Sequence, residues 1–124
     1  MLMKQIIIIG DGGEANINYG IHFSTSDHCY ILQNKNKLVI ELKYIYYYLY
    51  NNLEMLKQLY TGIGIKNISK INIQNIKIPI PSIYKQKEIV EYCDYNDNLI
   101  KQLEKEIEQN TIQAKQFIYN IINN

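Results

Sequence analysis

The chain has 124 residues, a formal net charge of +1, 47% hydrophobic residues and two cysteines, Cys29 and Cys93. This length and composition predict one domain with at most a small appendage, and they argue against wholesale disorder, a membrane-spanning helix and a disulfide scaffold. The first residues have neither a basic lead nor a cleavage site, so we expect a cytoplasmic protein that does not enter a membrane. The charge is +3 in residues 1–84 and −2 in residues 85–124, which is too balanced for a protein that grips nucleic acid by charge alone.

The first predicted element is a buried strand at Ile6–Ile9, followed by the glycine-rich residues 10–15, GDGGEA. The spacing G-x-G-x-x-A fits the dinucleotide-binding fingerprint, in which a strand turns directly onto a helix. Residues 16–23 instead alternate with a period of two, which favours a strand. We therefore expect a tight hairpin turn centred on Asp11-Gly12. A small nucleotide-binding protein that uses this turn remains an alternative.

Two further strands, a helix and a loop are predicted next. The strands are Ile17–Phe23 and Cys29–Gln33, separated by a polar stretch. Residues 42–60 change to helical periodicity and carry a tyrosine cluster. These rings can stack on bases or simply pack with their hydroxyls toward water, and we favour packing. The apolar stripe of this helix is Ile45, Leu49, Leu53, Leu56 and Tyr60, and the cluster is Tyr44, Tyr46, Tyr47, Tyr48 and Tyr50.

A glycine-marked loop at residues 61–69 leads to a short predicted strand at Asn75–Pro81. Its two prolines exclude a central position in a sheet at that end. Pro81 also interrupts any preceding helix, and Ser82 is placed to cap a new one by accepting a bond from its first turn.

The final helix, residues 85–122, carries an unbroken heptad seam over more than four heptads. A narrow apolar stripe about 57 Å long at 1.5 Å per residue needs a second helix to bury it. The two seam asparagines can fix the register of such a pairing. The alternative is a helix that folds back on its own domain. The predicted dimerisation or docking residues are Ile89, Cys93, Asn96, Ile100, Leu103, Ile107, Asn110, Ala114, Phe117 and Ile121.

The sequence contains no evident nucleophile–base pair, so we expect no enzyme activity and no cofactor. Cys29, His28 and His22 lack metal-ligand spacing, and turn or loop roles account for Asp11, Glu14 and Asp27. Lysines in the glycine loop can neutralise phosphates, and asparagine can pair with the edge of adenine. Each candidate taken alone is also an ordinary loop residue. The candidate DNA-binding residues are Lys66, Asn67, Ser69, Lys70, His22, Ser24, Thr25, Ser26 and His28.

Three segments together resemble the specificity subunits of type I restriction-modification systems: GIGIKNIS at 62–69, IKIPIP at 76–81 and QKEIVEY at 86–92. The resemblance implies an α+β fold, with a partial target-recognition domain at residues 1–81 and a long helix at 82–124. It further implies a protein without catalysis that reads double-stranded DNA. In this family two recognition domains are spaced by two antiparallel helices, which dock the methyltransferase and restriction subunits.

The chain departs from the family pattern in two ways. It has one recognition segment and one helix, so we expect a homodimer or pairing with another specificity half, and a homodimer reads a symmetric split site. A family recognition domain also has more residues before the glycine turn, so an N-terminal truncation is expected. The alternative is therefore a truncated relative without DNA binding that acts only as a coiled-coil assembly partner.

Overall fold

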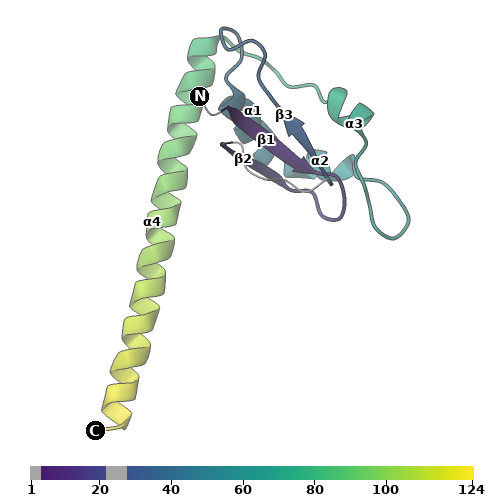
Figure 1. The fold of residues 1–124 in the computed structure, drawn as a ribbon. Coiled ribbons are helices and arrows are strands. Elements are labelled where there is room, and N and C mark those ends of the chain that lie inside the picture. The colour runs from purple at the N-terminus through teal and green to yellow at the C-terminus, as the bar shows by residue number, and fades with distance from the viewer. Residues whose placement is uncertain (1–3, 22–27) are drawn as a thin grey trace. The chain divides into compact units, whose positions relative to one another are not determined.

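The computed structural model describes residues 4–21 and 28–124 and shows an α+β architecture, as the sequence predicts (Figure 1). The chain divides into two compact units, the first ending at Val90 and the second comprising Glu91–Asn124. The first two turns of the last helix therefore belong to the first unit. The boundary between the compact units lies after Val90, whereas the sequence motifs place a boundary after residue 81. The elements are β1 (Gln5–Gly10), β2 (Ile17–Ile21), β3 (Cys29–Leu32), α1 (Leu42–Tyr50), α2 (Leu53–Gln58), α3 (Lys70–Gln74) and α4 (Ile83–Ile122).

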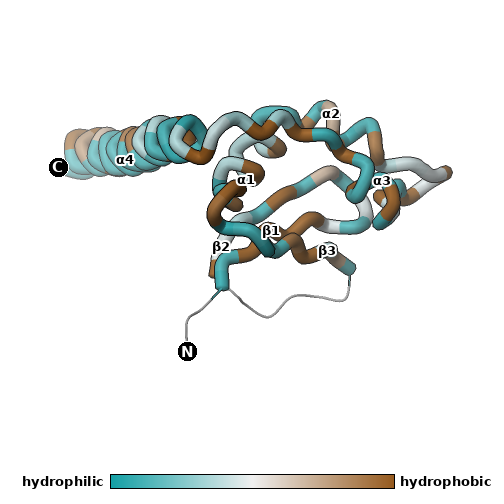
Figure 2. Tube along the Cα trace, turned by 90° about the horizontal axis from the view of Figure 1, so that it is seen from above, coloured by the Kyte–Doolittle hydropathy of each residue, from teal (hydrophilic) through white to brown (hydrophobic). Residues whose placement is uncertain are grey.

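The three strands form an antiparallel sheet in the order β2-β1-β3. Ile9 pairs with Ile17 on one side of β1, and Gly10 pairs with Cys29 on the other. All four isoleucines of β1 are buried, because a central strand can be covered on both faces and then reads as a continuous apolar run. In Figure 2 β1 is accordingly coloured as hydrophobic along much of its length.

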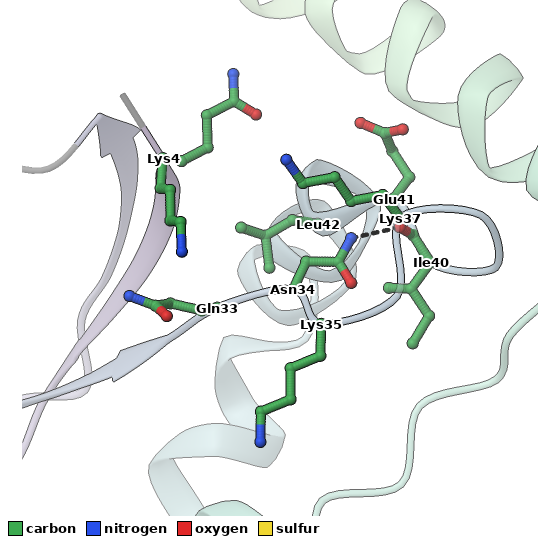
Figure 3. Close-up of a pocket in the computed structure, with 9 residues that line it drawn as sticks. Lys4, Gln33, Asn34, Lys35, Lys37, Ile40, Glu41 and Leu42 are labelled. Carbon is green, nitrogen blue, oxygen red and sulfur yellow. Dashed lines mark hydrogen bonds between the residues drawn. The ribbon is translucent and has the colours of Figure 1, made fainter. Parts of the chain in front are cut away.

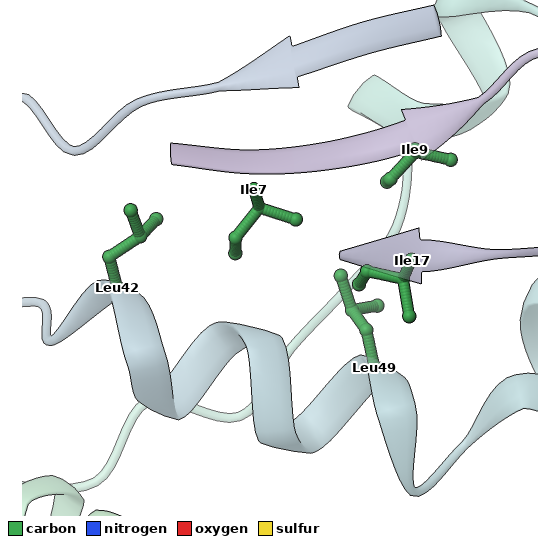
Figure 4. Close-up of a cluster of buried hydrophobic side chains, with 5 residues drawn as sticks. All are labelled: Ile7, Ile9, Ile17, Leu42 and Leu49. Atoms are coloured by element: carbon green, nitrogen blue, oxygen red, sulfur yellow. The ribbon is translucent and has the colours of Figure 1, made fainter. Parts of the chain in front are cut away.

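Helix α1 covers one face of the sheet and forms the main core with it (Figure 4). Side chains alternate along a strand, so Ile7 and Ile9 point to the same face, and there they meet Leu42 and Leu49. Ile7, Ile9 and Leu49 are at most 1% exposed. Fully burying such side chains contributes about 1.5–3 kcal/mol each.

The helix predicted at residues 42–60 is in fact two helices, α1 and α2, interrupted at Asn51 and Asn52. Asn51 Nδ2 donates to the Tyr47 carbonyl at 2.8 Å, and Asn52 Nδ2 donates to the Tyr48 carbonyl at 2.7 Å. Asparagine side chains that bond the preceding turn compete with the backbone ladder, which explains the break. The predicted stripe still faces inward, with three members buried and two half-buried: Leu49, Leu56 and Tyr60, then Ile45 and Leu53.

The tyrosine cluster of α1 packs against the domain. The Tyr44 hydroxyl donates to the Pro79 carbonyl at 2.6 Å, and Tyr44 and Tyr47 are buried. The rings of Tyr46 and Tyr19 on β2 lie 5.6 Å apart between centroids. Tyr50, at 52% exposed, is the open end of the cluster. These contacts support packing over base stacking.

The predicted strand at residues 75–81 is not formed. These residues follow α3, a short helix that the sequence analysis missed, and within the described residues no strand pairs with them. Pro79 and Pro81 have no N–H to donate to a ladder. Ile76 and Ile78 instead pack against the apolar core, which holds this segment without a partner strand.

Helix α4 begins with the cap predicted from the sequence, since the Ser82 Oγ accepts from the Lys85 amide at 3.3 Å. One turn later Gln86 is fully buried. Its Oε1 accepts from the Glu41 amide at 2.8 Å, and its Nε2 donates to the carbonyls of Val39 and Pro81, each at 2.8 Å. A single amide therefore fastens the first turns of α4 to the segment that enters α1.

The second unit, taken by itself, is the remainder of α4. Its seam is open: Ile100, Leu103, Ile107 and Phe117 are between 48% and 67% exposed. Among the described helices, none is both long enough and apolar enough to span a membrane.

Candidate nucleic-acid interface

The glycine-rich stretch connects β1 and β2, but it is not a two-residue turn. The register pairs Ile9 with Ile17, which leaves residues 11–16 as a six-residue connection. Gly13 has a φ of +78°, a conformation that L side chains rarely adopt. The hairpin was predicted correctly, whereas the tight turn at Asp11-Gly12 was wrong, because this connection bends toward a second loop instead of closing on itself.

A dinucleotide fingerprint requires a helix directly after its glycines. Strand β2 follows residues 10–15 and pairs antiparallel with β1. The nucleotide-binding alternative is therefore overturned by the topology of this segment.

The second loop lies between Thr61 and Asn67. The Thr61 amide donates to the Asn67 carbonyl at 2.8 Å, and the Asn67 amide returns a bond to Thr61 at 3.0 Å. Gly62 and Gly64 have φ values of +143° and +83°. Two backbone bonds thus close a short loop, and its two glycines supply conformations that other residues avoid.

The two loops are joined to each other across more than 50 positions of sequence. The Gly13 amide donates to the Lys66 carbonyl at 2.8 Å, and the Ile68 amide donates to the Asp11 carbonyl at 2.8 Å. A Cβ added at Gly12 would lie 2.6 Å from Asn67 Oδ1, so Gly12 allows this close approach. We call residues 10–16 together with residues 61–68 the loop pair.

The loop pair is anchored to the core by two tyrosines. The Tyr60 hydroxyl donates to the Gly10 carbonyl, and the Tyr30 hydroxyl donates to the carbonyl of Ile68 at 3.1 Å. Ile68 itself is buried. Burial raises the pKa of Tyr60, since the phenolate loses water contacts there. These contacts tie the loop pair to the folded core of the first unit.

The structure brings three of the sequence-predicted residues together at this end of the sheet. Lys66 and Asn67 are exposed on the loop pair. His28 joins them through Asp11, whose amide donates to the His28 carbonyl at 3.1 Å. The His28 Nδ1 lies 3.8 Å from Asp11 Oδ2, and the His28 side chain is 84% exposed. Lys66, Asn67 and His28 therefore lie at the same end of the sheet.

The remaining candidates divide into two groups. Ser69 caps α3, because its Oγ accepts from the Asn72 amide at 3.1 Å, and Lys70 is exposed at the first position of that helix. The serine hydroxyl is therefore already engaged in a structural bond. His22, Ser24, Thr25 and Ser26 lie outside the described residues.

Sequence reasoning missed the apolar tip of the second loop. Ile63 is fully exposed and Ile65 is 77% exposed, although isoleucine is usually buried. Their alternation with Gly62 and Gly64 was the available signal, because isoleucines between glycines of positive φ cannot pack inward as a helix or strand would. Within the described part of the chain, no group of three His, Cys, Asp or Glu residues is placed to hold a metal ion.

The first unit is a small sheet covered by short helices, with polar loops at one end, and the second unit is a helix with an exposed apolar seam. The chain belongs to the type I restriction modification DNA specificity domain family, whose sequence profile matches residues 2–109. This confirms the resemblance seen in the junction motifs. The specificity subunit is the non-catalytic component of such a system.

One relative shows the same assignment. The chain is 36% identical over 106 residues to the type I restriction enzyme MjaVIII specificity subunit of Methanocaldococcus jannaschii. The match covers 85% of this chain and 25% of the relative, so the chain spans about a quarter of that protein's length. No solved structure matches the chain.

Proposed function

We propose that this chain contacts double-stranded DNA through the loop pair and assembles through α4 with a second specificity half. The observation that carries the proposal is the loop pair itself. Its backbone is fixed by four hydrogen bonds between or within the loops, while Lys66 and Asn67 remain exposed on it. A rigid backbone that presents free polar side chains is what base-edge recognition requires, because ordering on binding then costs little entropy.

Different side chains contact different parts of the DNA, according to their chemistry. Lys66, and Lys70 beside the loop, neutralise phosphates and set the position of the domain. Asn67 and His28 carry the donor and acceptor groups that read base edges. Ile63 and Ile65 offer apolar contact of the kind made with a thymine methyl group. Ser69 has an indirect role, because its hydroxyl caps α3, the helix that begins with Lys70.

Assembly rests on the seam of α4. Its large apolar side chains Ile100, Leu103, Ile107 and Phe117 are between 48% and 67% exposed, and burying them on a matching helix supplies the free energy of association. Asn96 and Asn110 interrupt this seam and set its register. We propose a homodimer, or pairing with another specificity half, as the assembly that docks methyltransferase and restriction subunits. The protein works in the cytoplasm, a reducing compartment in which cysteines do not normally form disulfides.

The experiment is duplex binding by the full chain across a salt series. Each phosphate contact adds about 0.9 to the slope of log K against log salt. Lys66→Ala should therefore lower both the affinity and the slope, the slope by about one contact. Lys105→Ala is the matched control, since this lysine is exposed on the side of α4 opposite the seam.

The outcomes separate the two remaining functions. Steep salt dependence that Lys66→Ala reduces and Lys105→Ala does not is the result expected for a reading domain. A chain that associates through α4 yet binds no duplex at any salt concentration would instead be an assembly partner only.

A further inference from the structure

A basic pocket of about 620 Å³ lies at the end of the sheet away from the loop pair (Figure 3). It opens between the start of β1 and the segment that leads from β3 into α1. Three lysines line it, Lys4, Lys35 and Lys37, together with the amides of Gln5 and Gln33. Among the described residues of the lining, Glu41 is the one that carries a carboxylate. The lining therefore has an excess of positive charge that the near-neutral chain as a whole does not show.

Among the residues that the structure describes, the three ammonium groups of the lining outnumber the carboxylate of Glu41. Within that part of the chain, none of these ammonium groups forms an ion pair or a hydrogen bond with another residue. Bringing like charges into one pocket is unfavourable, and a bound anion removes that cost. Gln5 adds a donor, because its Oε1 is occupied by the Tyr19 hydroxyl and its NH2 group remains to donate.

The wall that carries two of these lysines is ordered by local side-chain bonds. Asn34 Nδ2 donates to the Ile40 carbonyl at 2.6 Å, and Asn34 Oδ1 accepts from the Asn36 amide at 3.0 Å. Asn36 Oδ1 in turn accepts from the Leu38 amide at 3.2 Å. Such asparagine turns fix a loop backbone that has no strand or helix of its own. Lys35 and Lys37 are consequently held at the pocket and not on a free loop.

We propose that this pocket binds a backbone phosphate of the same DNA duplex that the loop pair contacts. The inference rests on the proposed function and adds a second contact to it. The five steps from Gln5 to Gly10 separate the pocket and the loop pair by about 17 Å at ~3.4 Å per residue. A duplex carries one negative charge per ~1.7 Å of its axis, so a single duplex presents phosphates over this whole distance. The pocket contributes positioning and no base recognition, because ammonium groups on phosphates carry no sequence information.

The test compares duplex binding of four full-length chains across a salt series: wild type, Lys35→Gln/Lys37→Gln, Lys66→Gln and Lys105→Gln. The pocket variant should weaken binding equally for every duplex sequence, by about tenfold or more near 0.1 M salt. Its salt slope should fall by about 0.9, the value for one lost phosphate contact. Lys105→Gln should match the wild type. Thermal unfolding of the pocket variant, unchanged from wild type, shows that the domain still folds.

A second measurement identifies the anion. Amide NMR signals of Gln33, Lys35 and Lys37 should shift when a short duplex is added, and inorganic phosphate at low millimolar concentration should leave them in place. Shifts with inorganic phosphate and none with the duplex would overturn the proposal in favour of a small-anion site. Wild-type slope and affinity in the pocket variant would overturn it while leaving the proposed function intact. A wild-type chain that binds no duplex at all would overturn both the proposed DNA-binding function and the proposed phosphate contact.

Discussion

Replacing Gln86 tests whether one buried amide fastens the first turns of α4 to the rest of the first unit. Its side chain is 0% exposed and makes three hydrogen bonds, each 2.8 Å long. Leucine at this position has nearly the same volume and a similar helix propensity, so the packing and the helix are preserved. Gln86→Leu leaves the Glu41 amide and the carbonyls of Val39 and Pro81 without partners.

The expected loss follows from those three bonds. A typical intramolecular hydrogen bond contributes about 1 kcal/mol net, and an orphaned buried group costs about 1–3 kcal/mol. We therefore expect Gln86→Leu to lower the free energy of unfolding by about 3 kcal/mol. Gln86→Glu should be at least as harmful at neutral pH, because a carboxylate then faces two carbonyl oxygens. Its penalty should shrink as pH falls and the carboxyl group protonates, since a protonated carboxyl can donate one bond.

The assay is urea unfolding followed by circular dichroism and by tyrosine fluorescence, because the tyrosines cluster in the first unit. Gln102→Leu provides the matched control, as Gln102 is exposed on α4 outside the seam. That control should change the free energy of unfolding by less than about 0.5 kcal/mol. A Gln86→Leu chain as stable as the control would refute the reasoning, because it would mean that the three bonds contribute nothing.

Three further predictions concern the seam, the second loop and the alkaline limit of stability. Leu103→Asp should convert an assembled chain to a monomer in sedimentation or light scattering at unchanged helix content, and an unaffected assembly would rule out pairing through this seam. Gly62→Ala should cost about 1–3 kcal/mol of backbone strain, because φ is +143° and the new Cβ would lie 3.1 Å from the Ile65 carbonyl oxygen. Gly64→Ala, with φ +83° and nothing within 4 Å, should cost less, and equal losses in thermal unfolding would contradict this. Burial raises the pKa of Tyr60 and of Tyr44 above 10, so their contribution to stability is complete below pH 10 and is lost as pH rises above 10. The urea midpoint of the wild type should therefore fall at alkaline pH, and the midpoint of Tyr60→Phe should fall less. An equal fall in both chains would contradict this prediction for Tyr60.

Local patterns predicted the elements that depend on local order. The isoleucine run of β1, the heptads of α4 and the Ser82 cap are all visible within a few residues of sequence. The break at Asn51 was missed because apolar spacing does not register an asparagine that bonds its own preceding turn. The strand predicted at residues 75–81 failed for a related reason, since extended backbone becomes a strand only where a partner edge is available.

Long-range contacts explain most of what the sequence did not reveal about the site. The glycine loop was recognised as a candidate, but its bonds to Asp11 and Gly13 join positions more than 50 residues apart. Lys4 and Lys35 likewise line one pocket only after β1 and β3 have paired. Gln86 was visible as part of a family motif, and only its surroundings show that a glutamine is needed there to bridge one donor and two acceptors. The roles of the DNA-binding and seam residues stay predictions for the experiments above.

The tip of the second loop has a consequence for how such proteins change over generations. Residues 62–66 are exposed, whereas Thr61, Asn67 and Ile68 provide the bonds and burial that hold the loop in place. Substitutions at Ile63 or Ile65 therefore alter the displayed surface while leaving the core and its folding free energy nearly untouched. Single substitutions at this tip can therefore change the exposed surface in successive steps, and each intermediate sequence still folds.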